Sequence, residues 1–219
     1  MKEESLKRQP LVILGTGSFA PEIADLVEET DEYEVVAFVE SKYREKTRQT
    51  LDGKPIIWID EAAKISSTHQ AVCALASTFR RSFVERASKL GFSFATIIHP
   101  NASFSKKSSI GNGSILSAGT IIGANTVLGQ HVMINRGSLF GHHVNIGDFA
   151  TISPGVNIAA SVTVGEGTYV GMGAIILDRL TIGAHAVIGA GAVVTRDVPD
   201  CVQVMGIPAK ITKVNIEGR

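Results

Sequence analysis

Residues 120–147 read TIIGANTVLGQHVMINRGSLFGHHVNIG. Within this stretch an Ile, Leu or Phe recurs at every sixth position, at 122, 128, 134, 140 and 146. The spacing continues in both directions, so that sixteen consecutive sixth positions from Phe104 to Val194 carry an aliphatic or Phe side chain. In a chain that is 44% hydrophobic, such a run in one chosen phase would arise by chance roughly twice in a million trials. The six-residue repeat is therefore a real feature of the sequence.

The positions around the repeated apolar residue are also restricted. Two places before it the side chain is short or medium, mostly Ser, Thr, Ala or Val, and a Gly often follows it. A helix repeats every 3.6 residues and a strand every 2, so neither explains a period of six. If each hexad forms a short strand and a corner, three hexads close a triangular coil of 18 residues, and equivalent residues stack about 4.8 Å apart. The repeat predicts a parallel β-helix of a little over five coils.

The residues before the repeat have a different composition. Seven of the nine Phe and the only Trp lie before residue 105, whereas the later half is rich in Gly, Ile, Val, Ala and Ser. We predict two domains, 1–99 and 100–219, because an apolar run ends at His99-Pro100 and the repeat begins just after it. The first domain is expected to be a small α/β domain. Its elements are strands at 11–14, 34–39, 55–58, 71–76 and 94–98, a helix after the turn at 15–20, and a helix that packs through Phe79, Phe83, Ala87 and Leu90.

A glycine turn, Gly15-Thr16-Gly17-Ser18-Phe19-Ala20, follows the first of these strands. Glu40 ends the second strand, about 20 residues beyond the turn. This is the outline of a Rossmann-like dinucleotide fingerprint. A single glycine turn opens many βαβ units, and about one hundred residues leave no room for a second mononucleotide half. NAD binding is therefore an alternative and not the expected function.

The charge pattern disfavours several classes of partner. The chain has 21 basic and 21 acidic residues and a formal net charge of zero, so it lacks the clustered positive charge that binds nucleic acid or an anionic membrane. No apolar run approaches the roughly 20 residues that span a bilayer, and no signal-peptide core follows the N-terminus. We expect a cytoplasmic protein with no nucleic-acid partner and no membrane insertion, in which Cys73 and Cys201 are unpaired thiols.

Several motifs in the second half resemble a known family. The repeat itself, with its Ile or Val, Gly and small residues, is similar to that of the hexapeptide-repeat acyltransferases, whose fold is a left-handed parallel β-helix. The closing segment DVPDCVQVMGIPAK (197–210) resembles the family's exit signature. Ile134-Asn135, His142, the run 146–149 and Ser153-Pro154-Gly155 resemble the bacterial sugar acetyltransferases that include sialic acid O-acetyltransferases and nucleotide-amino-sugar N-acetyltransferases. The resemblance implies acetyl-CoA as co-substrate, a nucleotide-linked sugar as acceptor in surface glycan synthesis, and a homotrimer with active sites between neighbouring β-helices.

The resemblance also assigns roles to individual residues. It implies that His142 is the general base, because acetyl transfer needs a group that removes a proton from the attacking amine or hydroxyl. The family commonly has Asp or Glu after this histidine, whereas this sequence has His143, which we expect to modulate the base. The residues implied at the cofactor are Thr151, Gly155, Met172, Ala190 and Gly191, and those implied at the sugar substrate are Gly15, Gly17, Ser18, Phe19, Glu40 and Asn135.

Several alternatives stay open at this level. N-acetylation of an amino sugar is preferred because a neutral amine asks less of its base, but O-acetylation of a sialic-acid-type hydroxyl is close behind. A three-histidine zinc site of the carbonic anhydrase kind is disfavoured, because His142 and His143 are adjacent and Gly147 stands where a further ligand would be needed. A non-catalytic β-helix scaffold is the remaining alternative. Asp178 shares the corner column of His142 but lies two coils away, so a carboxylate partner would come from another subunit.

Overall fold

A computed structural model describes residues 8–216 and 218–219, and it divides the chain into two compact units. The first unit comprises the residues up to Leu75 together with Phe83–Ala95, and the second comprises Ala76–Ser82 together with Thr96–Arg219. The chain therefore passes between the units at three points, 75/76, 82/83 and 95/96. The boundary predicted at His99-Pro100 falls just after the first strand of the second unit.

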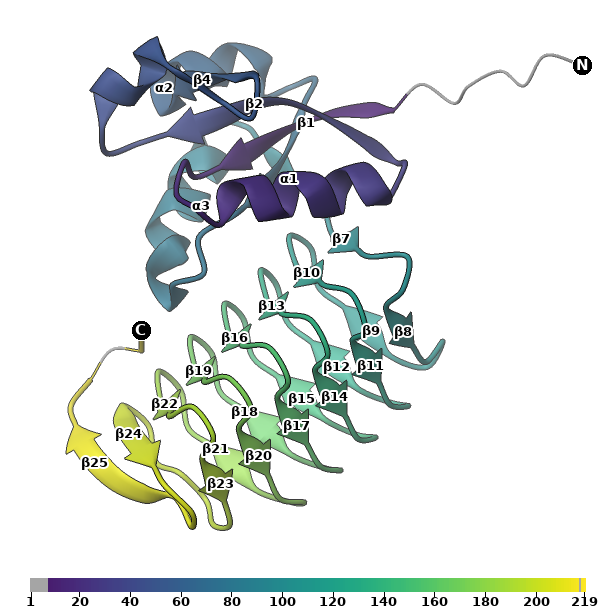
Figure 1. The fold of residues 1–219 in the computed structure, drawn as a ribbon, viewed down its shortest axis with the longest axis vertical. Helices are drawn as coiled ribbons and strands as arrows, with labels where there is room; N and C mark the ends of the chain where they lie inside the picture. Colours follow the sequence, from purple (N-terminus) through teal and green to yellow (C-terminus); the bar gives the residue numbers. More distant parts are fainter. Residues whose placement is uncertain (1–7, 217) are drawn as a thin grey trace, which may run out of the picture. The chain divides into compact units, whose positions relative to one another are not determined.

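The first unit is built on a six-stranded sheet in the order β3-β4-β2-β1-β5-β6, parallel except for the β3–β4 pair (Figure 1). Its central strand carries Leu11–Leu14 fully buried, and α1 packs on β1 and β2 through Ile23, Leu26 and Val27. The strands are β1 (Gln9–Leu14), β2 (Tyr33–Glu40), β3 (Thr50–Leu51), β4 (Lys54–Trp58), β5 (Gln70–Cys73) and β6 (Ser93–Phe94), and the helices are α1 (Ala20–Glu29), η1 (Arg44–Arg48), α2 (Ile59–Ala62), η2 (Ala63–Ile65), η3 (Thr78–Arg80) and α3 (Arg81–Lys89).

Two sequence-based predictions for this region need correction. The single strand expected at 94–98 is divided between β6 of the first unit and β7 of the second, because Ile97 and Ile98 pair with Ile115 and Leu116 of the next coil. The helix expected to begin at Phe79 begins at Arg81, after the short 3-10 helix η3. Phe79 is 58% exposed, so it does not join Phe83 and Ala87 on the buried face of the helix.

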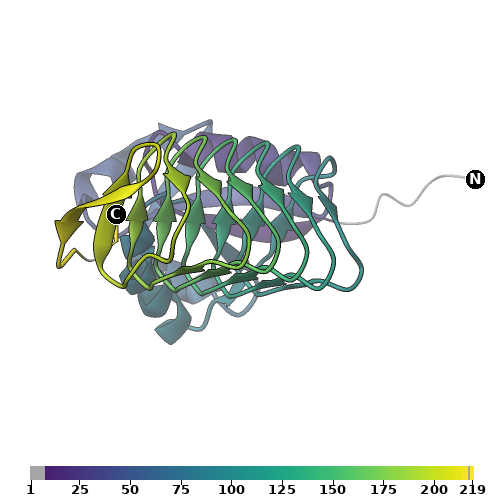
Figure 2. The ribbon, with the colours of Figure 1, turned by 90° about the horizontal axis from the view of Figure 1, so that it is seen from below.

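The second unit is a left-handed parallel β-helix made of two-residue strands in three parallel stacks (Figures 1 and 2). Paired residues are 18 positions apart, as in Ile122 with Phe140, which confirms the coil length predicted from the repeat. The first stack contains β7 (Ile97–Ile98), β10 (Ile115–Leu116), β13 (Met133–Ile134), β16 (Thr151–Ile152), β19 (Tyr169–Val170) and β22 (Val187–Ile188). The second contains β8 (Ser103–Phe104), β11 (Ile121–Ile122), β14 (Leu139–Phe140), β17 (Asn157–Ile158), β20 (Ile175–Ile176) and β23 (Val193–Val194), and the third contains β9 (Ser109–Ile110), β12 (Val127–Leu128), β15 (Asn145–Ile146), β18 (Thr163–Val164) and β21 (Thr181–Ile182).

Each place in the hexad has a physical role in this stacking. The repeated aliphatic side chains fill the interior, and those from Leu116 to Val194 are nearly all fully buried. Many of the small residues two places earlier are Ser or Thr whose hydroxyl donates to a carbonyl 15 residues later, such as Ser114 to Gly129 O at 3.0 Å and Thr168 to Gly183 O at 2.7 Å. The Gly is required by close coil contact: a Cβ on Gly171 would lie 2.6 Å from Ala190 N. Corners are therefore held by side-chain hydrogen bonds and kept narrow by glycine.

The C-terminal segment covers the last coil. β24 (Val202–Met205) pairs in parallel with β22, and β25 (Lys210–Val214) returns antiparallel on β24. Within the described residues, Cys73 and Cys201 form no disulfide bond. In the part of the chain that the structure describes, no helix has the length and apolar character needed to cross a membrane.

Candidate active site

His142 and His143 lie together at one corner of the β-helix, in the turn between β14 and β15. Both side chains are exposed, and their Nδ1 atoms are 2.9 Å apart. The rings meet edge to face, with an interplanar angle of 89° and centroids 5.0 Å apart. Nε2 of His143 in turn lies 3.1 Å from Nδ2 of Asn125, which occupies the equivalent corner of the preceding coil. The pair is therefore linked to a third polar side chain that the sequence motifs did not indicate.

The backbone explains why these side chains converge. His143 and Asn125 both have left-handed backbone, with φ of 57° and 58°, and Ser161 and Arg179 continue the same column at 60° and 59°. Asn and His are enriched in this conformation. His143 N donates to Ala124 O at 2.8 Å, which fixes the spacing of the two coils. Repetition of one corner geometry thus stacks Asn125 against His143.

No carboxylate occupies the adjacent coils at this corner. The column of His142 continues to Ala160, whose coil is held by the bond from Ser161 N to His142 O at 2.9 Å. Asp178 comes one coil later and lies 3.5 Å from the neighbouring Arg179. Asp178 is thus about 10 Å from His142, as two strand spacings require. Within the described residues, the nearest polar partner of the imidazole pair on these coils is an amide and not an acid.

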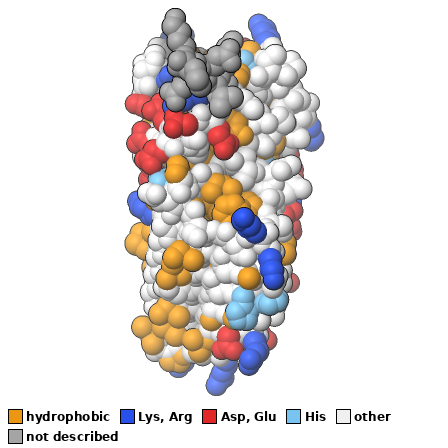
Figure 3. Space-filling model, turned by 90° about the vertical axis from the view of Figure 1, so that its right-hand side faces the viewer, with side chains coloured by type: hydrophobic (Ala, Val, Ile, Leu, Met, Phe, Trp, Pro, Cys, Tyr) orange, Lys and Arg blue, Asp and Glu red, His pale blue; other side chains and the backbone are white. Residues whose placement is uncertain are grey.

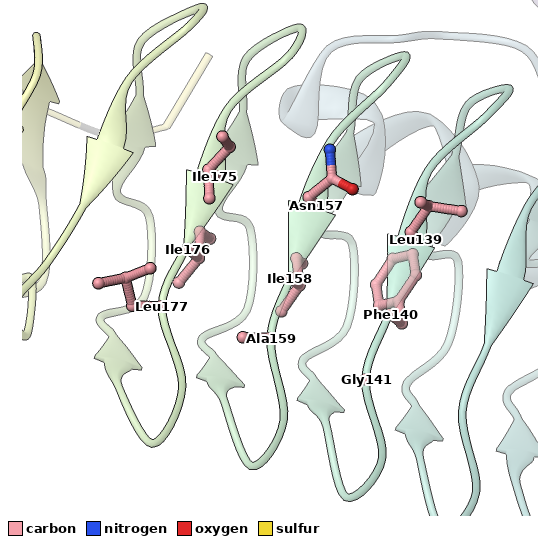
Figure 4. A pocket seen from close by; sticks show the side chains of 9 residues that line it. All are labelled: Leu139, Phe140, Gly141, Asn157, Ile158, Ala159, Ile175, Ile176 and Leu177. Carbon is pink, nitrogen blue, oxygen red and sulfur yellow. The ribbon is translucent and has the colours of Figure 1, made fainter.

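An apolar groove runs across the second stack of strands beside this corner (Figure 4). It has a volume of about 330 Å³ and is lined by residues of three successive coils, among them Leu139, Gly141, Asn157, Ile175 and Leu177. Leu139, Ile175 and Leu177 are each about two-fifths exposed. The space-filling view in Figure 3 shows histidine and apolar side chains exposed on one side of the molecule. Gly141, which lines the groove, directly precedes His142 in the sequence, although neither imidazole is among the lining residues.

Four of the five residues expected at the cofactor lie at the next corner, across the second stack from His142. Met172 and Ala190 stack there, with Gly191 N donating to Met172 O at 2.8 Å, and Met172 is 60% exposed. Gly155 and Gly191 have φ of 69° and 65°, and a Cβ on either would meet no atom within 4 Å. Their backbone is therefore accessible at the surface of this chain.

Thr151 and Asn135, by contrast, are buried. Thr151 is 1% exposed, and its hydroxyl accepts from Arg80 Nη1 at 2.7 Å. Asn135 is 7% exposed and donates from Nδ2 to Ile152 O at 3.1 Å. Both side chains hold neighbouring segments of the second unit together, and neither presents its polar group at an open surface.

Arg80, which sequence reasoning overlooked, is the largest fully buried side chain. Its guanidinium donates to the carbonyls of His131, Phe149 and Ala150 at distances between 2.6 and 3.3 Å. The His131 ring stacks on Phe149 with centroids 5.0 Å apart. Burial, assisted by the charges of Arg80 and Arg81 and opposed by Asp148, lowers the pKa of His131 to about 4. His131 is thus neutral near pH 7 and is part of the packing.

The glycine turn and Glu40 are close together within the first unit. Gly15 has φ of 121° and Gly15 N donates to Val39 O at 2.9 Å, while Gly17 and Ser18 are exposed and Phe19 is half-buried. Both carboxylate oxygens of Glu40 are engaged within the chain. Oε1 accepts from the backbone N–H groups of residues 41–43, and Oε2 accepts from the Thr16 hydroxyl and lies 3.5 Å from Lys46 Nζ.

This environment sets the charge state of Glu40. Burial by itself raises the pKa of Glu40, but the hydrogen bonds from Thr16 and from three backbone N–H groups outweigh it and hold the pKa below its ordinary value. Glu40 is a buried anion that fixes the loop after β2. In the part of the chain described, no group of three or more His, Cys, Asp or Glu side chains is placed to hold a metal ion.

Comparison with known proteins places these features in context. The bacterial transferase hexapeptide (six repeats) model matches residues 161–196, and the PglD N-terminal domain model matches residues 10–87. No curated protein matches the chain at a significant level.

Three solved structures are similar over nearly the whole chain. PerB from Caulobacter crescentus, in complex with CoA and GDP-perosamine, is 31% identical, with a TM-score of 0.85 over 93% of this chain and 97% of PerB. The acetyltransferase domain of PglB from Neisseria gonorrhoeae, in complex with acetyl coenzyme A, is 29% identical, with a TM-score of 0.85 over 94% of this chain and all of that domain. WeeI from Acinetobacter baumannii is 28% identical, with a TM-score of 0.85 over 93% of this chain and all of WeeI.

Proposed function

Since this chain belongs to the hexapeptide-repeat sugar acetyltransferases, we propose that it transfers the acetyl group of acetyl-CoA to the amino group of a nucleotide-linked sugar. The observation that carries the proposal is the exposed His142, which follows Gly141 of the apolar groove, in a chain similar over 93% of its length to PerB, whose crystals contain CoA and GDP-perosamine. We propose surface glycan synthesis as the setting of this reaction.

His142 is the general base in this proposal. The lone pair of the sugar amine attacks the thioester carbonyl carbon, and the N–C bond forms while Nε2 of His142 takes a proton from the nitrogen. The C–S bond then breaks, and the imidazolium returns the proton to the departing thiolate, which leaves as CoA thiol. Atoms and charge balance without any further reactant. An imidazole suits both steps because its pKa lies near neutral pH.

The cofactor is proposed to lie along the groove of the second stack, with its thioester near His142. Met172, Ala190 and the backbone of Gly155 and Gly191 are proposed to contact it from the next corner. We also propose a homotrimer with active sites between neighbouring β-helices, because the exposed Ile121, Leu139 and Ile175 of the second stack offer an apolar surface for contacts between chains.

The glycine turn is proposed to hold the nucleotide part of the acceptor. Gly17 and Ser18 are exposed, and Gly17 leaves room for close approach because a Cβ there would meet no atom within 4 Å. Gly15 and Phe19 are proposed to shape the turn. Glu40 acts through the loop 41–43, which its carboxylate fixes, and Thr151 and Asn135 act through the packing of the coils.

The test is a substrate panel followed by free-thiol release from acetyl-CoA. UDP-, dTDP- and GDP-linked 3-amino and 4-amino sugars are compared with sialic acid. We expect turnover of an amino sugar, and His142→Ala should lower kcat by about two to four powers of ten. His185→Asn, at a corner remote from the groove, should keep the wild-type rate. Turnover of sialic acid alone would replace this proposal by O-acetylation, and tight binding of NAD without binding of CoA would remove it.

A further inference from the structure

Asn125, His143 and His142 form a continuous chain of side-chain contacts across two coils of the β-helix. The Asn125 amide lies 3.1 Å from Nε2 of His143, and Nδ1 of His143 lies 2.9 Å from Nδ1 of His142. Both distances are those of hydrogen bonds. The outer end of the chain is Nε2 of His142, the one ring nitrogen of the pair without a partner among these three residues. What the Asn125 amide presents to His143 therefore determines which atom of His142 carries the proton.

The contacts allow two proton arrangements. A neutral imidazole has one N–H and one acceptor nitrogen. When one ring nitrogen accepts a hydrogen bond, the other must therefore be the donor, and the reverse also holds. In the structure Nδ2 of Asn125 faces His143. That N–H donates to Nε2 of His143, whose own proton then lies on Nδ1 and is donated to Nδ1 of His142. His142 is left with its proton on Nε2. In this arrangement its outer nitrogen is a donor and has no lone pair for a substrate proton.

A rotation of the Asn125 amide by 180° exchanges donor and acceptor in each hydrogen bond among Asn125, His143 and His142. The two ends of an amide have nearly the same shape, so the turn changes chemistry and not packing. Oδ1 then accepts from Nε2 of His143, Nδ1 of His143 accepts from Nδ1 of His142, and the lone pair of His142 Nε2 faces outward. We propose that Asn125 is a positioning residue that acts through His143 to set the tautomer of His142, and that the arrangement with Oδ1 as acceptor is the reactive one. This inference rests on the proposed role of His142 as general base.

The series of contacts from Asn125 through His143 also takes the place of the acid that is missing beside His142. When Nε2 of His142 accepts the amine proton, the Nδ1–H of the imidazolium is held by His143, and the positive charge is stabilised by the carbonyl dipole of Asn125. The charged groups of this corner are Lys106 and Lys107 two coils before the imidazoles, and Asp178 with Arg179 two coils after. At about 10 Å and with opposite signs, they supply no close fixed charge. The amide is the one group of the adjacent coils that holds His143 on its outer side.

Two substitutions of Asn125 test whether its side chain acts as a hydrogen-bond acceptor for His143. Asn125→Asp keeps the size and presents only acceptor oxygens, which enforces the reactive arrangement and places an anion behind His143. Asn125→Gly removes the side chain at a φ of 58° that glycine adopts without strain. Arg179→Gly makes the same change at a corner with φ of 59° two coils away and serves as the control.

The first readout is kinetic, measured as kcat and KM against pH. Asn125→Asp should keep kcat within about threefold of wild type, and the added anion should move the acid limb of its pH profile upward by about one unit. Asn125→Gly should lower kcat by about three- to tenfold, the value of one hydrogen bond, with both KM values unchanged. Arg179→Gly should match wild type. Equal losses in the Asp and Gly variants, or wild-type profiles in both, would overturn the proposal.

The second readout does not need turnover. Nitrogen-15 shifts of the imidazoles, assigned with His142→Ala and His143→Ala, report the tautomer of each ring and the apparent pKa values of the pair. Asn125→Asp should move the His142 tautomer towards Nδ1–H and raise the apparent pKa values, and Asn125→Gly should leave a mixture of tautomers. Tautomers identical in wild type and both variants would refute the coupling. If no acceptor is turned over, the proposed function fails, while these spectra still decide whether Asn125 governs His142.

Discussion

His131 illustrates how one buried titratable side chain couples the fold to pH. Its ring is stacked on Phe149 and lies beside the Arg80 guanidinium, and its pKa is lowered to about 4. In the unfolded chain the same group titrates near 6.5. Between these values the unfolded state binds more protons than the folded state, so the free energy of unfolding rises with pH. The contribution is complete above about pH 6.5 and is lost as the pH falls towards 4.

We expect His131→Asn to remove this part of the pH dependence. Asn tolerates the left-handed φ of 54° at this position. Between pH 7 and pH 4 the free energy of unfolding of the wild type should fall by about 3 kcal/mol more than that of the variant. Urea unfolding at fixed protein concentration measures the difference. His185→Asn, in the same column with φ of 55° and a side chain that is 39% exposed, is the control. Equal slopes for His131→Asn and wild type would contradict the prediction.

The motif at His142 indicated one residue of the candidate site but not its partners. Asn125 is 18 residues from His143, a contact that becomes visible only once the coil length is applied to polar residues as well as apolar ones. Arg80 reaches carbonyls 51 to 70 residues away, and no local pattern signals that contact. Glu40 was predicted from its spacing after the glycine turn, but its hydrogen bonds to residues 41–43 depend on the path of the loop.

The two-residue strands of the β-helix depend on their corners for stability. Each strand contributes few backbone bonds, so buried hydroxyls that tie a coil to the next one matter for the element as a whole. Thr168 donates to Gly183 O at 2.7 Å and accepts from Ala186 N at 3.3 Å. Thr120 occupies the same place in an earlier hexad, yet its buried hydroxyl has no hydrogen-bond partner among the described residues. The hydroxyl is therefore expected to stabilise the folded protein at Thr168 and to destabilise it at Thr120, although the two residues occupy equivalent places in their hexads.

Substitution of these two residues by Val should give opposite results. Thr168→Val leaves buried backbone groups without their side-chain partner and should lower the free energy of unfolding by about 1–2 kcal/mol. Thr120→Val removes a buried hydroxyl that makes no bond, so it should be neutral or should stabilise the protein by up to about 1 kcal/mol. Urea midpoints at equal slope measure both. Equal destabilisation by the two variants would show that the hydroxyl bonds are not what holds the corners.

The two units do not correspond to two continuous stretches of the sequence. Residues 76–82 lie between two segments of the first unit in the sequence, yet they belong to the second. Arg80 contributes to this because its buried guanidinium satisfies carbonyls on two successive coils, and Ser77 and Thr78 donate to Arg219 O. The β-helix is therefore incomplete without a piece of chain from the first hundred residues.

We expect Arg80→Met to destabilise the β-helix strongly, although residue 80 precedes the repeat. The substitution keeps much of the volume but leaves several buried carbonyls and the Thr151 hydroxyl without a donor, at a cost of about 3 kcal/mol or more. Arg81→Met is the matched control, because Arg81 makes an exposed ion pair with Glu166 and stacks on Phe149, together worth about 1 kcal/mol. Denaturant unfolding at fixed protein concentration measures both, and similar midpoints for the two variants would contradict the role given to Arg80.

At this scale, periodicity predicted the β-helix because a repeated interior position is a local property of each hexad. The junction was harder to predict. The apolar run 94–98 has the composition of one strand, and its division between β6 and β7 depends on which neighbours each residue pairs with. In the same way, the spacing of Phe79, Phe83 and Ala87 is typical of a helix face, but α3 begins only at Arg81, after Arg80 has bonded to the β-helix.

The strict 18-residue coil has a consequence for how such a gene can change in length. Because paired strands from β7 to β23 are 18 positions apart, loss or duplication of one whole coil keeps every later side chain in its own stack and shifts the C-terminal strands β24 and β25 by a single strand spacing. Loss of one residue inside a strand turns all the following interior side chains towards solvent. The length of the repeat region is therefore expected to evolve in steps of one coil, and shorter insertions are confined to corners, where they bulge outward without changing the frame.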